Sequence, residues 1–149
     1  MTRVAGYELE ELLALRELTR DQLQERFGID EGGVDADVAY ERLGGVDALY
    51  DPSAFPGHFF VRGDDLVMIY IPRTALADTD LAELRRALGE PAATLSSRTG
   101  EDSSLLVYPD QGVAFATDGE HVEIVEVFPP TTLDDYRTRT YKEPPERIR

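Results

Sequence analysis

Two histidines, His58 and His121, are the side chains of this 149-residue chain best suited to proton transfer or metal binding near neutral pH. His58 follows a Pro-Gly pair at the start of an expected strand, and His121 lies on an expected hairpin. A metal site needs histidines that converge with carboxylates, and no spacing in the sequence brings these two together. We interpret each as an ordinary sheet residue and expect neither a metal nor a cofactor.

Other kinds of chemistry lack their sequence patterns. The chain has no cysteine for thiol catalysis and no Gly-x-Ser-x-Gly elbow for a serine nucleophile. Its glycine pairs at 32–33 and 44–45 are isolated and form no phosphate-binding loop. Asp35 and Asp37, with Glu41, resemble the opening of a calcium loop without its glycine and terminal glutamate. We interpret these acids as a solvated face or a helix cap.

An enzyme would have to build its pocket from scattered polar residues. The candidates are Arg73, Arg98, Tyr108 and His121. The sequence therefore favours a non-enzymatic protein and nominates no catalytic residue. A small-ligand-binding protein or an enzyme, with a pocket of scattered Asp, Arg and Tyr side chains, is the alternative.

Aromatic side chains gather around the loop at residues 51–57, where they could anchor a protein partner. The predicted binding residues are Phe55, Phe59, Phe60 and Tyr70. The opposing interpretation is that these rings fill the core beneath a long loop. Because a contact surface is the functional feature left after the catalytic and metal-binding patterns are set aside, the sequence predicts a protein-interaction or assembly module. An immunity or inhibitor protein, whose acidic surface masks a basic active site, is one version of this function.

Thirty acidic residues oppose fifteen basic ones, which gives a net charge of −15, and Lys142 is the only lysine. A field this negative repels nucleic acid and anionic membranes, so neither is expected as a partner. The composition resembles that of halophilic cytoplasmic proteins, whose self-repulsion is screened by molar salt. An ordinary acidic protein from a GC-rich genome is the alternative.

The length fits one compact domain over 1–149, and residues 142–149 are expected to form an extended tail. No signal peptide is visible, and the longest apolar run, residues 66–72, is too short to span a membrane. We therefore expect a cytoplasmic protein. The oligomeric state is not readable from the sequence.

Two similar helix signals suggest tandem halves, residues 7–76 and 77–141. After a first helix at residues 7–17, Thr19 and Gln22 form a capping box, and Gly28 ends the second helix. Asp80 and Glu83 repeat the box farther along the chain, and Gly89 ends that helix. The strand ends also match, with residues 70–76 against 127–133. Coincidence is the alternative, because caps and closing glycines are common.

Two hairpins complete the expected fold. In one, strands 113–117 and 120–127 flank Asp118-Gly119, a type I′ turn signal that pairs Phe115 with Val122. A shift in the apolar pattern after Ile124 predicts a bulge or cover on both faces. In the other, strand 66–71 is apolar throughout and belongs either at a sheet centre that is covered on both sides or at an interface. The expected class is α+β, an antiparallel sheet with helices packed on one face.

Residues 80–129 contain, in order, a helix, Leu-Gly-Glu-Pro at 88–91, Tyr-Pro-Asp-Gln-Gly-Val at 108–113, Asp-Gly at 118–119 and Val-Glu-Ile-Val-Glu-Val-Phe at 122–128. This pattern resembles the SmpA/OmlA module of outer-membrane assembly lipoproteins, whose fold tandem β-lactamase inhibitor proteins share. The resemblance implies a helical layer on a short antiparallel sheet that binds other proteins without catalysis. This sequence lacks the lipoproteins' signal peptide and anchoring cysteine, so only fold and binding mode are carried over.

Overall fold

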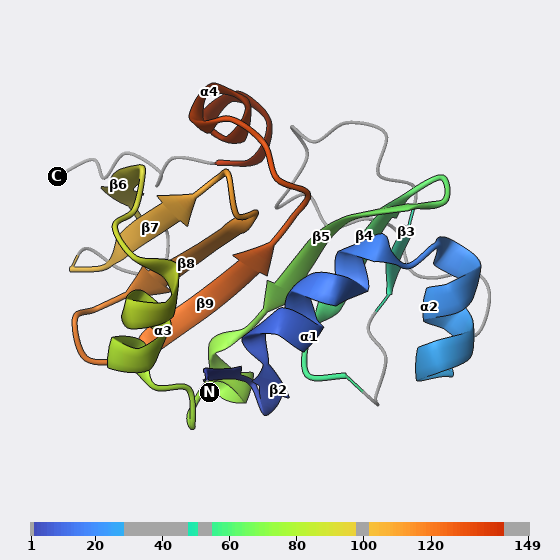
Figure 1. Ribbon diagram of the computed structural model, residues 1–149, viewed down its shortest axis with the longest axis horizontal. Helices are drawn as coiled ribbons and strands as arrows, with labels where there is room; N and C mark the ends of the chain where they lie inside the picture. Colours follow the sequence, from blue (N-terminus) through green and yellow to red (C-terminus); the bar gives the residue numbers. More distant parts are fainter. Residues whose placement is uncertain (1, 29–47, 51–54, 98–101, 142–149) are drawn as a thin grey trace, which may run out of the picture.

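The computed structural model describes residues 2–28, 48–50, 55–97 and 102–141, and it has the expected α+β architecture (Figure 1). Within these residues one open antiparallel sheet contains seven strands, in the order β3-β4-β5-β9-β8-β7-β6. The strands are β3 (Ala48–Tyr50), β4 (His58–Arg62), β5 (Asp65–Ile71), β6 (Ala93–Ser96), β7 (Ser104–Tyr108), β8 (Val113–Thr117) and β9 (Val122–Val127). A separate small ladder joins β1 (Arg3–Val4) to β2 (Tyr7–Glu8).

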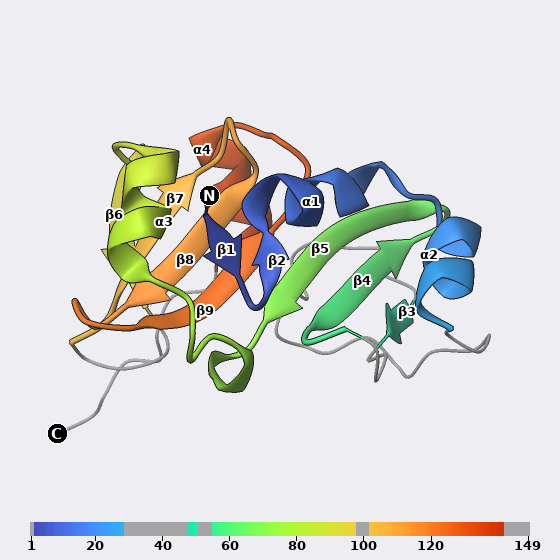
Figure 2. The same ribbon diagram turned by 60° about the horizontal axis from the view of Figure 1, so that its bottom comes forward.

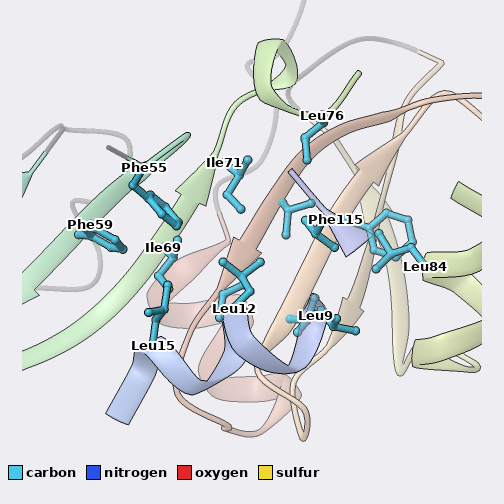
Figure 3. Packing of buried hydrophobic residues seen from close by; sticks show 14 of the residues in the cluster. Leu9, Leu12, Leu15, Phe55, Phe59, Ile69, Ile71, Leu76, Leu84 and Phe115 are labelled. Carbon is cyan, nitrogen blue, oxygen red and sulfur yellow. The ribbon is translucent and has the colours of Figure 1, made fainter. Parts of the chain in front are cut away.

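In the described part of the chain, three helices cover one face of the large sheet, which we call the helical face (Figures 1 and 2). They are α1 (Leu9–Ala14), which continues into the 3-10 turn η1 (Leu15–Glu17), then α2 (Arg20–Phe27) and α3 (Leu81–Leu88). Another 3-10 turn, η3 (Arg73–Ala75), links β5 to α3. Figure 3 shows Leu9, Leu12 and Leu15 directed from α1 and η1 onto the sheet. Burial of such leucines is the main force that holds this layer.

The opposite face, which we call the C-terminal face, is covered in part by the segment that follows β9. This segment contains α4 (Leu133–Asp135) and the π-helical turn η4 (Tyr136–Thr140). Its Tyr136 and Tyr141 pack on Phe60, Met68 and other buried side chains of the sheet. The sheet therefore has apolar cover on both faces, and β5 is buried along nearly its whole length, as its sequence predicts.

The predicted helix caps are present. The Thr19 hydroxyl accepts from the Gln22 N–H at 3.3 Å, and Gln22 Oε1 accepts from the Thr19 N–H at 2.9 Å. The Asp80 carboxylate accepts from the Glu83 N–H at 3.0 Å. The expected helix at 7–17 begins later, at Leu9, because Tyr7 and Glu8 pair with β1. The acids at 35, 37 and 41, interpreted as a solvated face or a helix cap, and the tail at 142–149 lie outside the described residues.

The predicted register of β8 and β9 is wrong. Phe115 pairs with Val125 instead of Val122, and Thr117 pairs with Val122. The reason is a four-residue loop, in which the Asp118 carboxylate accepts from the N–H groups of Glu120 and His121, both at 2.8 Å. A side chain that bonds to the backbone in this way replaces the two-residue turn. The register shift lies between Ala116 and Thr117, while the pairing is regular across Ile124 and Val125, where the apolar pattern predicted a bulge or cover on both faces. Of these two alternatives, the described structure has the cover on both faces.

The hairpins β4–β5 and β8–β9 have the same pairing register. Each residue of β4–β5 corresponds to a residue of β8–β9 a constant number of positions farther along the chain, the number that separates His58 from Ala114. The bulge after Phe60 recurs after Ala116. Strand β3 pairs with β4 in the same register as β7 with β8. Strands β5 and β9 pair with each other at Tyr70 and Glu126, and these two residues also correspond to each other between the hairpins. Because corresponding residues of the two antiparallel strands lie opposite each other, a local two-fold axis relates the hairpins. The matching pairs are His58–Tyr70 with Ala114–Glu126, Phe59–Ile69 with Phe115–Val125, and Val61–Leu66 with Thr117–Val122.

Candidate functional site

The four predicted contact rings do not form one surface. Phe55 and Phe59 stack at 4.5 Å between ring centroids in the core of the helical face, and Phe27 of α2 lies within 5.4 Å of both (Figure 3). Phe60 points to the C-terminal face, because successive side chains of a strand alternate. Phe55, Phe59 and Phe60 are all buried, so the interpretation as core residues replaces that of exposed anchors.

Tyr70 is the partly exposed member of the set, and it lies on the C-terminal face. Its ring stacks on His58 at 6.0 Å between centroids. His58, Tyr70 and Glu126 are cross-strand neighbours on β4, β5 and β9, so their side chains form a row across this face.

Glu126 binds the C-terminal segment to the sheet. The Tyr136 hydroxyl donates to Glu126 Oε1, and both side chains are buried. Burial raises the pKa of Tyr136 far above its usual value, and the neighbouring Glu126 carboxylate raises it further. Farther along, the Tyr141 hydroxyl donates to the Ser96 carbonyl oxygen at 2.8 Å. The segment is therefore tied to the sheet centre and to the edge strand β6.

A small pocket lies between this segment and the end of the β4–β5 hairpin. Its volume is about 140 Å³. Buried Val67 and Phe128 provide apolar walls, and Pro129 and Pro130 form an exposed rim. The polar lining consists of Arg62, Thr131, Asp135, Arg139 and Thr140. We call this cavity the C-terminal pocket.

The backbone beside the C-terminal pocket is fixed from the opposite face. The Phe128 N–H donates to the Gly112 carbonyl oxygen at 2.9 Å, and the Phe128 carbonyl oxygen accepts from Arg16 Nη1 at 2.9 Å. Arg16 also donates to the carbonyl oxygens of Gln111 and Leu13. Burial lowers the pKa of Arg16. Gly112 leaves room for this guanidinium, since a Cβ there would overlap Arg16 Nη1 and the Phe128 carbonyl oxygen.

The lining of the pocket carries charges of both signs. Arg62 and Arg139 contribute two guanidinium groups, and Asp135 contributes one carboxylate. The Thr131 hydroxyl donates to Asp135 Oδ2 at 3.3 Å.

Among the described residues nominated for an enzyme, Tyr108 lies at the opposite end of β8 from His121. Tyr108 is buried and donates to the Gly89 carbonyl oxygen at 3.0 Å, which fixes the end of α3. His121 is exposed beyond the other end of β8, beside Asp118. Arg73 lies 4.0 Å from the buried Glu123, which accepts a hydrogen bond from the Ser103 hydroxyl. Arg98 and the acids at 35, 37 and 41 lie outside the described residues.

Sequence reasoning missed the C-terminal pocket. Pro129 and Pro130 are visible in the sequence as a strand end, but Arg62 and Arg139 lie far apart along the chain and share no motif. The pocket exists because the segment after β9 folds back over the hairpin end, which no local pattern specifies.

No family model, curated protein or solved structure matches this chain. Among the residues that the structure describes, no helix is long and apolar enough to cross a membrane. In the same residues, no three His, Asp or Glu side chains are grouped as metal ligands.

Proposed function

We propose that this protein is a non-enzymatic protein-interaction module that holds one side chain of its partner in the C-terminal pocket. The observation that carries the proposal is the size of the cavity. Pockets for cofactors and drug-sized ligands measure roughly 300–1,000 Å³. The C-terminal pocket, at about 140 Å³ and open to solvent on one side, is smaller than these. A single side chain fits this volume.

The lining supports the same function. Arginine and aromatic residues are enriched at the centres of protein interfaces, and anchor side chains enter well-packed pockets. Here the buried Phe128 and Val67 meet two arginines beneath a proline rim. Because hydrogen bonds already fix the backbone at Phe128, this wall of the pocket adds little ordering cost to binding.

The test is site-specific cross-linking in the native cell. A photo-reactive amino acid replaces Pro130 at the exposed rim, and in a control protein it replaces the exposed Ala87 of α3 on the other face. We expect an adduct from position 130 and none of the same mass from position 87. Thr131→Trp should fill the pocket and remove the adduct. An adduct that survives Thr131→Trp, or that forms equally from position 87, would contradict the proposal.

We also propose that the chain consists of two tandem halves, 7–76 and 77–141. The shared register and shared bulge, at one constant sequence offset, support this proposal. The sequence comparison aligned Tyr70 with Val127. The pairing register instead makes Glu126 the counterpart of Tyr70, so that alignment is wrong by one position. The likeness to the SmpA/OmlA module, the inhibitor-type role and the cytoplasmic location stay predictions.

A further inference from the structure

We propose that Arg16 is a positioning residue for the partner's side chain, because it holds the proline rim of the C-terminal pocket in the geometry that binds. This inference rests on the proposed function and names what sets the shape of the same site. Arg16 lies in η1 on the helical face, outside the lining of the pocket. It acts through Phe128, which forms one of the apolar walls.

The contact uses three donor groups of one guanidinium. Nε donates to the Leu13 carbonyl oxygen at 3.0 Å, which holds the side chain against its own helix. Nη1 donates to the Gln111 carbonyl oxygen at 2.8 Å and to the Phe128 carbonyl oxygen at 2.9 Å. Hydrogen bonds from a charged donor are stronger than those between neutral groups. One cation therefore joins the helical face, the turn before β8 and the end of β9.

The turn at residues 109–112 is a firm support for this cation. The Gln111 side chain donates from Nε2 to the Leu88 carbonyl oxygen at 2.9 Å, at the end of α3. Within the turn, the Gly112 N–H donates to the Pro109 carbonyl oxygen at 3.1 Å. Gly112 also leaves the space in which Arg16 reaches Phe128. The guanidinium is thus held between groups that are themselves fixed.

The rim depends on this support through the peptide bond between Phe128 and Pro129. A peptide group is planar, so a bond that fixes the Phe128 carbonyl oxygen also fixes the plane from which the Pro129 ring starts. The two prolines of the rim have no N–H with which to anchor themselves. On either side of them, the N–H groups of Phe128 and Thr131 donate to carbonyl oxygens of the turn at residues 109–112. The bond from Arg16 orients the rim from its carbonyl side.

The first measurement is amide hydrogen exchange of the ¹⁵N-labelled full chain carrying Arg16→Met, which removes all three donors. We expect exchange at Phe128 and Thr131 to accelerate about tenfold more than exchange in the ladder of β8 and β9, because the rim opens locally while the sheet stays folded. Asp80→Ala is the matched control, since it removes the cap of α3 on the same helical face. In that variant Phe128 and Thr131 should accelerate no more than the ladder.

The second measurement is the yield of the cross-link from position 130 in the native cell. Arg16→Met should lower the yield about tenfold, the weight of one charge-assisted hydrogen bond. Asp80→Ala should leave the yield within about twofold, although it also lowers stability. Should Arg16→Met fail to fold, Arg16→Lys takes its place. Its ammonium is one bond short of the Nη1 position, so exchange should again accelerate selectively at Thr131.

The outcomes separate this inference from the function on which it rests. If a folded Arg16→Met protein gives an undiminished cross-link, the inference is overturned and the proposed function stands. If exchange accelerates equally at Thr131 and in the ladder, Arg16 only stabilises the fold, which also overturns the inference. If the protein with Arg16 intact gives no cross-link from position 130, the proposed function fails, and the positioning role fails with it.

Discussion

The hydrogen bond between Tyr136 and Glu126 should be the strongest single link between the C-terminal segment and the sheet. The Tyr136→Phe substitution removes only the hydroxyl and leaves the ring in place among its neighbours Phe128 and Tyr141. Its effect on stability therefore reports the hydrogen bond and not a change in packing.

The expected magnitude follows from burial and from the acceptor. Tyr136 is 0% exposed and Glu126 is 6% exposed, so water cannot readily replace the lost donor. Hydrogen bonds to charged groups contribute about 1.5–3 kcal/mol. We expect Tyr136→Phe to lower the free energy of unfolding by about 2 kcal/mol.

Tyr141→Phe is the matched control. Its hydroxyl donates to a backbone carbonyl oxygen, a neutral acceptor, so we expect a loss of about 0.5–1.5 kcal/mol. Urea unfolding measures both variants, with unchanged slopes required for a fair comparison. In a Glu126→Gln background the effect of Tyr136→Phe should shrink, as a double-mutant cycle would show. A Tyr136→Phe loss no larger than that of Tyr141→Phe would refute this reasoning.

The same bond predicts a pH dependence. Burial, and then the charge of Glu126, raises the pKa of Tyr136 above that of an unfolded tyrosine, which is near 10. A group whose folded pKa is raised contributes stability that is complete below the unfolded pKa and declines as the pH rises beyond it. Stability should therefore fall above about pH 10. The decline should be shallower in Tyr136→Phe, as unfolding measured between pH 9 and 11 would show.

Three further predictions concern other parts of the fold. Gly112→Ala should cost about 3 kcal/mol or more, from overpacking against Arg16 and a φ of +72°. Gly119→Ala should lower the free energy of unfolding by less. Its φ of +99° also disfavours alanine, but nothing lies within 4 Å of the new Cβ. Equal losses for the two variants in urea unfolding would contradict the predicted clash at position 112. The backbone N–H groups of His121 and Glu120 lower the pKa of Asp118 to about 2. Its stabilising contribution should be present above about pH 4 and be lost as the pH falls toward 2, so acid unfolding of Asp118→Ala should show a flatter profile there. The −15 charge predicts a melting temperature that rises from 0.1 to 2 M KCl; a flat or falling curve would contradict the halophilic interpretation.

Local chemistry made much of the fold predictable. The caps at Thr19 and Asp80 depend on residues three positions apart, and both are present. The unbroken apolar run of β5 predicted either an interface or a central strand with cover on both faces, and β5 lies inside the sheet between β4 and β9. The caps depend on interactions between residues three positions apart, and the placement of β5 follows from its unbroken run of apolar residues, so both can be read from the sequence.

The rest depends on side-chain interactions and long-range contacts that the residue pattern does not record. The register of β8 and β9 depends on the Asp118 carboxylate, whose two bonds to the backbone replace the turn that Asp-Gly suggested. Adjacent phenylalanines at 59 and 60 belong to opposite faces, so aromatic density in the sequence did not indicate one surface. The C-terminal pocket needs the hairpin end and the segment after β9 together, and the sequence contains no pattern for that contact.

The central claim is that the C-terminal pocket holds a partner's side chain, and the cross-link from position 130 tests it most directly. The measurement is the adduct yield by mass spectrometry, compared between the unfilled pocket and the Thr131→Trp variant. The account predicts a yield that falls at least tenfold when tryptophan fills the pocket, while the melting temperature changes little. A yield within twofold of the original, in a folded Thr131→Trp protein, would contradict it.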